Sequence, residues 1–258
     1  MFVNSFSNGD FMKKVYYESF SDELVKNSNQ EYKLKDNFKW IHNSIIYNIY
    51  SYIVYLFFVI FGFIYLKVYY RVKFVNKKVL RKYKKYYIYS NHTLEMGDPF
   101  IPLVSNFPRR SFTLVNPANL GVPVIGKLVP MVGGIPIPDN VHDIIKMRDG
   151  MKYHLDKNRC IVIFPEAHVW PYCNFIREFP KTSFRFPVED DVPSFVYTTT
   201  FKKTKFRKTP KVIVHISGPF YGEGNTNKEK IASLHDQVFE EMNKNITDSY
   251  EYIKYIKK

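Results

Sequence analysis

The sequence predicts an α/β protein in which a mixed, largely parallel sheet is flanked by helices and preceded by an N-terminal hydrophobic membrane helix. Two observations lead to this fold class. After Arg71, short apolar runs typical of strands alternate with patterns typical of helices, as in a series of βα units. Before that point, 22 residues from Ile45 to Leu66 carry no formal charge. The 258 residues suffice for one domain of moderate size with an attachment segment.

The N-terminal third of the chain divides into two parts. Residues 1–43 are polar and mixed in charge, so we expect a loosely structured lead-in that could hold one short helix. Residues 44–70 are expected to form a membrane-attachment helix, because about 20 apolar residues cross a bilayer. Tyr47, Tyr50 and Tyr52 suit headgroup depth, so a helix lying in one leaflet is the alternative.

Basic residues are unevenly distributed along this chain of net charge +14. Nine Lys or Arg and no acidic residue lie between Lys67 and Lys85, and a second basic run spans Lys202 to Lys211. Such runs attract nucleic acid, anionic lipid or acidic small molecules. Nucleic acid is disfavoured, because the first run adjoins the apolar helix and no nucleic-acid-binding pattern is present. By the positive-inside rule, residues 71–258 lie on the cytoplasmic side of a membrane.

Residues 71–258 contain the strands and helices of the predicted domain. Two amphipathic helices are indicated by apolar residues on one helical face, at 141–155 and 231–242. Strands are predicted at 86–90, 110–115, 133–137, 161–164, 195–201 and 211–216. The two cysteines, Cys160 and Cys173, form no CxxC pair, which favours a reduced setting, and we expect no metal site.

The first candidate catalytic segment runs from Ser90 to Pro99. His92 directly follows an apolar strand, and ligands bind at the carboxyl ends of strands in open α/β sheets. A histidine there can accept a proton from an alcohol if a carboxylate orients its other ring nitrogen. Helix geometry favours Glu95 as this carboxylate, since it lies about 60° from His92, whereas Asp98 lies about 120° away. On this argument both Glu95 and Asp98 remain candidates for the carboxylate that orients His92.

Three further segments carry polar or conformationally special residues. Glu166 follows the predicted strand 161–164 and should reach the same edge as His92. Gly133 and Gly134 permit close backbone approach or positive φ. A Val-Pro pair at 192–193 precedes another strand.

Taken in order, these motifs resemble the lysophosphatidate (glycerophospholipid) acyltransferase family, in a divergent bacterial-type subgroup. The resemblance covers about residues 72–246 and rests on Asn91-His92 with Asp98, Gly133-Gly134-Ile135, Phe164-Pro165-Glu166 and Val192-Pro193. It implies transfer of a fatty acyl group from acyl-CoA or acyl-carrier protein to a hydroxyl of a lipid acceptor in phospholipid biosynthesis or remodelling. His92 would be the base, and Asp98 rather than Glu95 would be its partner. No cofactor is implied beyond the thioester co-substrate.

The resemblance also implies substrate contacts. Glu166 would orient the acceptor hydroxyls, and backbone N–H groups near Gly133, Gly134 or just after His92 would stabilise the oxyanion. The family's usual phosphate-binding arginines are replaced here, by Pro138 or Asp139 and by Ala167-His168-Val169. Candidate substrate-binding residues therefore also include Asn91, His168, Arg177, Lys181 and Arg185.

Two alternatives remain open on the sequence alone. The same site in a lipid thioesterase would use water as the acceptor. A non-catalytic membrane protein could retain the fold, since five residues separate His92 from Asp98 where four are usual in the family.

Overall fold

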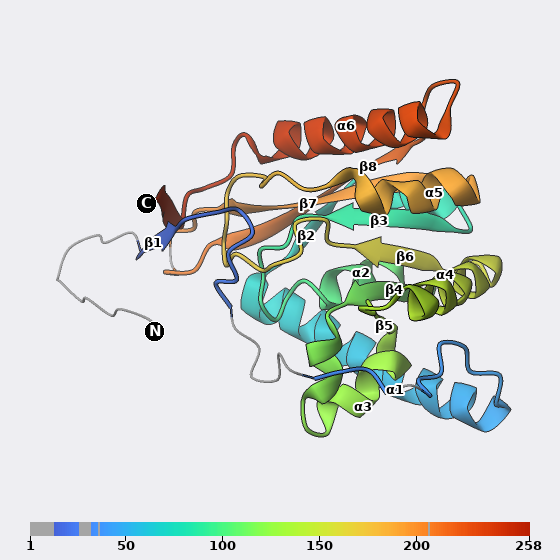
Figure 1. The fold of residues 1–258 in the computed structure, drawn as a ribbon. Coiled ribbons are helices and arrows are strands. Elements are labelled where there is room, and N and C mark those ends of the chain that lie inside the picture. Colours follow the sequence, from blue (N-terminus) through green and yellow to red (C-terminus); the bar gives the residue numbers. More distant parts are fainter. Residues whose placement is uncertain (1–12, 26–31, 36, 206) are drawn as a thin grey trace.

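The computed structural model describes residues 13–25, 32–35, 37–205 and 207–258. Helices cover both faces of a central sheet (Figure 1). In the described part of the chain this sheet has seven strands, in the order β2-β8-β7-β3-β6-β4-β5. Every neighbouring pair is parallel except β7 and β8. The strands are β2 (Lys73–Val75), β3 (Tyr86–Ser90), β4 (Ser111–Val115), β5 (Gly134–Pro136), β6 (Cys160–Ile163), β7 (Ser194–Lys202) and β8 (Lys211–Phe220). The predicted fold class is confirmed.

The helices form two layers. They are α1 (Ile45–Tyr65), α2 (Phe100–Asn106), α3 (Ile125–Val132), α4 (Val141–Asp156), α5 (Arg185–Asp190) and α6 (Asn227–Ile246). Short helical turns are η1 (Leu66–Tyr70), η2 (Lys77–Lys82), η3 (Pro117–Gly121) and η4 (Lys181–Phe184). Successive side chains of β3 point to opposite layers. The Tyr86 hydroxyl donates to Asn106 at the end of α2, whereas the Tyr87 hydroxyl donates to Asp190 of α5.

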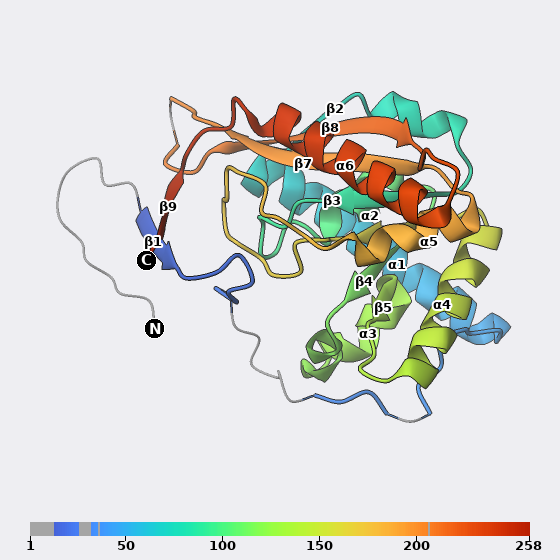
Figure 2. The same cartoon turned by 45° about the horizontal axis from the view of Figure 1, so that its top comes forward.

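The polar lead-in contributes a strand, which differs from the expectation of loose structure. β1 (Lys13–Tyr17) pairs in parallel with β9 (Ile253–Lys257) as a separate two-stranded sheet near the C-terminus (Figure 2). Each strand is short and carries lysines, so its own sequence gives a weak signal. It is stabilised by pairing with a partner about 240 residues away along the chain and by contacts of Tyr17 and Tyr255 with Trp170.

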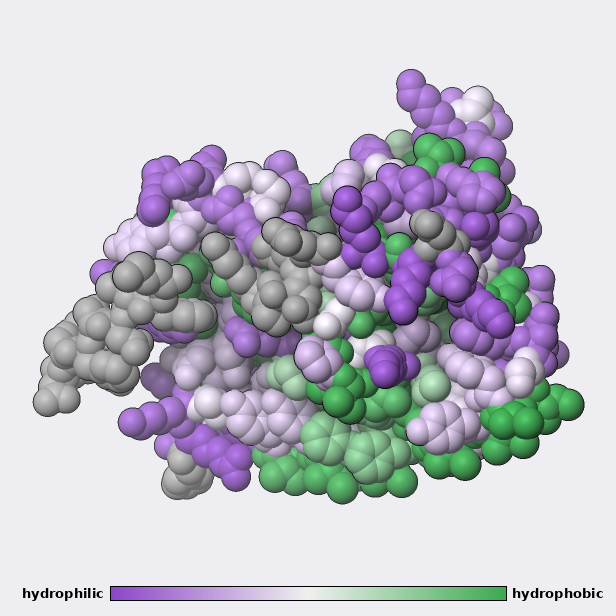
Figure 3. Space-filling view, turned by 60° about the horizontal axis from the view of Figure 1, so that its bottom comes forward, coloured by the Kyte–Doolittle hydropathy of each residue, from purple (hydrophilic) through white to green (hydrophobic). Residues whose placement is uncertain are grey.

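The long apolar helix α1 lies along the domain with one face packed and the other exposed. Its buried residues recur every three or four positions and continue into η1, as Ser51, Tyr55, Val59, Gly62, Leu66 and Tyr70. Gly62 permits the close approach of α2, because a Cβ at this position would lie 2.6 Å from Cδ1 of Phe100. Residues 45–70 are long and apolar enough to cross a membrane, and only 28% of the most apolar window is buried. The exposed side forms an apolar surface (Figure 3).

Candidate active site

His92 and Glu166 meet at the carboxyl edge of the sheet. β3 and β6 are adjacent and parallel, with Tyr89 opposite Ile163, so the residues that follow both strands emerge at one edge. The backbone N–H of His92 donates to Oε2 of Glu166 at 2.9 Å. The structure thus brings the first two sequence motifs into direct contact.

Asp98 is the carboxylate that contacts the His92 ring. Its Oδ2 lies 2.6 Å from Nδ1 of His92 and also accepts the backbone N–H groups of Thr93 and Leu94, at 2.8 and 2.9 Å. The Asp98 side chain is fully buried, whereas 19% of the His92 side chain is exposed. Glu95 is exposed to solvent. The chain after His92 forms a turn rather than a helix, so the ideal helical angles that favoured Glu95 do not apply.

This geometry favours one tautomer of the histidine. Because an Asp98 carboxylate accepts from Nδ1–H, the neutral ring carries its free lone pair on Nε2. No described residue hydrogen-bonds that Nε2. The ring also stacks on Phe164 at a centroid separation of 4.4 Å. The arrangement can therefore remove a proton from a hydroxyl and stabilise the resulting imidazolium.

Glu166 is held by a buried arginine. Arg177 donates its backbone N–H to Oε1 at 2.9 Å and its Nη2 to Oε2 at 3.0 Å, and both side chains are almost completely buried. Its guanidinium also donates to the carbonyls of His168 and Phe20 and lies over the Trp170 ring. Arg177 is therefore not free for a substrate phosphate, and protein donors occupy the Glu166 carboxylate that was predicted to orient acceptor hydroxyls.

The loop after β6 is bonded to the loop after β3. Trp170 and Tyr172 donate their N–H groups to the carbonyls of His92 and Thr93, at 3.0 and 2.8 Å. Ala167, which follows Glu166 in this loop, has φ of 62°. This left-handed conformation favours glycine, so Ala167 carries local strain.

The catalytic loop also packs against the apolar helix. Gly97 permits this contact, because a Cβ there would lie 2.9 Å from Cε2 of Tyr70 in η1. Only Pro99 separates Asp98 from α2, whose Phe100 packs against Phe61 and Tyr65 of the α1 segment. The candidate site therefore lies beside the end of α1.

The structure does not bring several other predicted residues to His92. The buried Asn91 side chain bonds both backbone groups of Thr199, which ties β3 to β7. Gly134 is the first residue of β5, three strands from β3, and pairs with Thr113 of β4. The Gly133 N–H caps α3 by donating to the Pro130 carbonyl. The Gly133 N–H therefore has an acceptor within the protein, and so do the N–H groups of Thr93 and Leu94, which donate to Asp98.

Lys181 and Arg185 lie elsewhere on the surface. Lys181 is exposed on η4 and pairs with Asp236 of α6 at 3.2 Å. Arg185 is exposed at the start of α5, over the Phe186 ring. Both belong to the layer opposite α1. Of the candidate phosphate-binding residues, only the partly exposed His168 lines a cavity next to Glu166.

The N-terminal segment contributes to this region, which the sequence did not predict. The Asp22 carbonyl accepts from the Trp170 indole at 2.9 Å, in addition to the bond from Arg177 to Phe20. Residues 17–21 form one wall of a cavity of about 650 Å³ whose other walls include Glu166 and His168. No local pattern in the polar lead-in indicates this role.

Comparison with known proteins adds evidence on the fold. No protein-family model matches the chain, and no curated protein sequence matches it. Among solved structures, the chain is similar to the 1-acyl-sn-glycerophosphate (LPA) acyltransferase PlsC from Thermotoga maritima, with a TM-score of 0.51 and 14% sequence identity. The match covers 79% of this chain and 99% of that chain. The chain therefore has the fold of an acyltransferase.

Proposed function

We propose that this protein is a membrane-bound O-acyltransferase of the lysophosphatidate acyltransferase type. It transfers a fatty acyl group from acyl-CoA or acyl-carrier protein to a hydroxyl of a lysophospholipid or related lipid acceptor. The observation that carries the proposal is the 2.6 Å contact between His92 and the buried Asp98, on a fold shared with an acyltransferase.

The proposed reaction uses His92 as general base and then as general acid. Nε2 takes the proton of the acceptor hydroxyl while the hydroxyl oxygen forms a bond to the thioester carbonyl carbon. The tetrahedral intermediate collapses with cleavage of the C–S bond, and the imidazolium returns the proton to the leaving thiolate. Asp98 keeps the proton on Nδ1 in the resting state and stabilises the charged ring. No acyl-enzyme forms, so no nucleophilic serine is needed.

Glu166 and Arg177 act in this proposal as positioning residues. Glu166 fixes the His92 backbone, and Arg177 fixes Glu166 from the buried side. The Phe164 ring restricts rotation of the imidazole. A histidine held in this way reaches its transition-state orientation without further ordering.

Membrane attachment through α1 follows from its apolar outer face. Large exposed side chains run along the whole helix, from Ile45 and Ile46 to Ile60 and Ile64. Because the domain covers the opposite face along the full length, we propose that α1 lies in the plane of one leaflet. A spanning orientation would carry polar parts of the domain into hydrocarbon. The in-plane helix places the acceptor lipid beside His92.

The second basic run meets the beginning of the first run near the end of α1, on the cytoplasmic side in this proposal. Arg71 donates to the Thr209 carbonyl at 2.6 Å, and Arg207 donates to the Val68 carbonyl at 3.4 Å. The lysines around these anchors are exposed. They would attract anionic lipid heads, each contributing about 1 kcal/mol near the surface, or the phosphates of the thioester carrier.

Acyl transfer in detergent tests the proposal. Radiolabelled palmitoyl-CoA and palmitoyl-carrier protein are offered with a panel of lysophospholipids and glycolipids. Wild type is compared with His92→Ala and with His142→Ala, a matched control at an exposed histidine of α4. We expect labelled lipid with wild type and His142→Ala, and none with His92→Ala.

Two results would count against the proposal. Equal product from wild type and His92→Ala would remove His92 from the chemistry. Release of free palmitate by wild type at the same rate with and without any acceptor would identify a thioesterase instead.

A further inference from the structure

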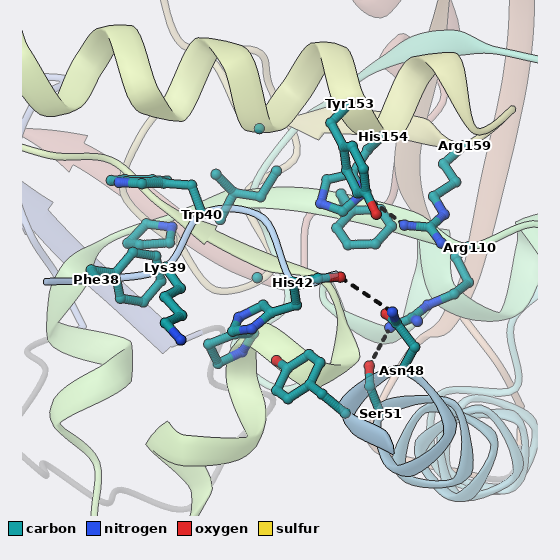
Figure 4. A pocket seen from close by; sticks show the side chains of 17 residues that line it. Phe38, Lys39, Trp40, His42, Asn48, Ser51, Arg110, Tyr153, His154 and Arg159 are labelled. Atoms are coloured by element: carbon teal, nitrogen blue, oxygen red, sulfur yellow. Dashed lines mark hydrogen bonds between the residues drawn. The ribbon is translucent and has the colours of Figure 1, made fainter. Parts of the chain in front are cut away.

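A second polar cavity lies at the opposite edge of the sheet from His92. Arg110 and Arg159 immediately precede β4 and β6, so both lie at the amino ends of parallel strands. The cavity measures about 40 Å³, and its walls come from residues 38–42, from α1, from α4 and from these two arginines (Figure 4). The proposed acyl transfer makes no use of this cavity.

The cavity walls carry positive charge without compensation. The cations Lys39, Arg110 and Arg159 line it together with His42 and His154, and none of the described lining residues is Asp or Glu. Neither arginine forms an ion pair with a described residue. Burial and the charge of Arg159 lower the pKa of Arg110 to about 10. Burial, together with Arg159 and Arg110, lowers the pKa of His154 to about 3, so this histidine is neutral.

The two guanidinium groups are held in place by the protein. Arg110 lies over the rings of Tyr55 and Phe112, and its Nη2 donates to Ser51 Oγ at 3.1 Å and to the Met131 carbonyl at 2.5 Å. Arg159 lies over the same Phe112 ring, and its Nη1 lies 2.8 Å from Nδ1 of the neutral His154. Packing against aromatic rings fixes these cations but does not neutralise them.

Donors beyond these bonds remain available for a ligand. Nε of Arg110 is buried and has no partner among the described atoms. Asn48 and Tyr153 add polar side chains to the walls. A buried N–H without a partner is unfavourable, so a ligand that accepts hydrogen bonds would be stabilised here.

We propose that this cavity is a binding site for a phosphate group. Planar guanidinium groups match the oxygens of phosphate, and two of them with Lys39 offset its double charge. The volume fits one small tetrahedral anion, since it corresponds to about three water molecules. A larger ligand would place its phosphate group in the cavity and leave the rest of the molecule outside it.

The position of the cavity allows two sources of that phosphate. Asn48 and Ser51 line it from the first half of α1, whose exposed face there carries Ile45, Ile46 and Ile49. If that face meets the membrane, a lipid phosphate lies within reach of the cavity. A free phosphate ion or soluble phosphate monoester is the other source.

Calorimetric titration tests the site in the full chain. The protein is purified in phosphate-free non-ionic detergent and titrated with inorganic phosphate, with dihexanoyl phosphatidate and with dihexanoylglycerol, at ionic strength matched with chloride. Arg159→Gln and Lys39→Gln are the test variants, and Lys228→Gln is the matched control at an exposed lysine of α6. Far-UV circular dichroism verifies that each variant is folded.

We expect wild type and Lys228→Gln to bind phosphate, and Arg159→Gln to bind it about tenfold more weakly or worse. Tighter binding of dihexanoyl phosphatidate that also falls in Arg159→Gln would identify a lipid head as the source. Equal affinities for inorganic phosphate and for dihexanoyl phosphatidate would identify the free anion as the source. Phosphatidate bound at the candidate active site would not respond to Arg159→Gln.

The proposal is overturned if no titration exceeds the dihexanoylglycerol and chloride baseline. It is also overturned if folded Arg159→Gln and Lys39→Gln both bind phosphate as wild type does. Neither result bears on acyl transfer by His92, because the two sites lie at opposite edges of the sheet.

Discussion

Replacing Arg177 should destabilise the protein far more than replacing an exposed basic residue. In the Glu166–Arg177 pair, the exposed fractions of the side chains are 1% and 0%. Arg177→Met leaves the Glu166 carboxylate buried without its cation, a change that costs about 3–5 kcal/mol in buried pairs. It also removes donors from the carbonyls of Phe20 and His168. The loss is large beside a typical stability of about 5–15 kcal/mol.

The matched control is Lys181→Met, which breaks an ion pair of similar length at the surface. Lys181 and Asp236 are 50% and 56% exposed, so solvent screens their attraction and the expected cost is about 0–1 kcal/mol. Denaturant unfolding in detergent, followed by far-UV circular dichroism, measures both values. The double variant Arg177→Met/Glu166→Gln should recover about 1–3 kcal/mol relative to additivity, because it removes the stranded charge.

Activity provides a second measurement on the same proteins. Since Glu166 positions the His92 backbone, Arg177→Met should lower kcat without a selective rise in the KM of the acceptor. The reasoning is refuted if Arg177→Met unfolds as wild type does and raises only that KM. Arg177 would then contact the substrate rather than Glu166.

Three further predictions test other parts of the structure. Asp98→Asn should lower kcat by about 10²–10⁴, since the amide cannot hold the Nδ1–H tautomer, whereas Glu95→Gln should leave acyl-transfer rates almost unchanged. Ala167→Gly should raise the free energy of unfolding by about 0.5–1 kcal/mol, because relief of the positive φ exceeds the entropic cost of glycine; lower stability in denaturant unfolding would contradict this. Ile60→Asp should weaken sedimentation with anionic vesicles about tenfold or more, and Val141→Asp on α4 should not; equal loss would mean that α1 is not the contact surface.

The sequence predicted the elements whose signals are local. The buried strands β3, β6 and β7 were placed to within one or two residues, because continuous apolar runs bounded by polar residues are typical of buried parallel strands. The amphipathic helices α4 and α6 were placed from the helical periodicity of their apolar residues, which is also a local signal. The short strands β1, β2 and β9 were not predicted, because each depends on a partner elsewhere in the chain.

The sequence also predicted that His92 and Glu166 lie at one edge of the sheet, because neighbouring parallel strands have their carboxyl ends at the same edge. Helical spacing left both Asp98 and Glu95 as partners of His92, and only the family resemblance favoured Asp98, because the choice depends on an irregular turn closed against Tyr70 of η1. The sequence predicted that Arg177 contacts a substrate, whereas this buried side chain forms an ion pair with Glu166 and donates to the Phe20 carbonyl.

By itself, the sequence determined the alternation of strands and helices and the position of the apolar segment, because periodicity is a local property. It also determined the sheet edge at which His92 and Glu166 emerge, because strand direction follows from the order of the elements. Only the tertiary structure decided which carboxylate meets His92, which face of α1 is buried and where Arg110 and Arg159 converge. These are contacts between segments far apart in the chain, as in the bond between Arg177 and Phe20, whose positions differ by 157. Such contacts are set by the packing of the whole domain and leave no periodic trace in either segment.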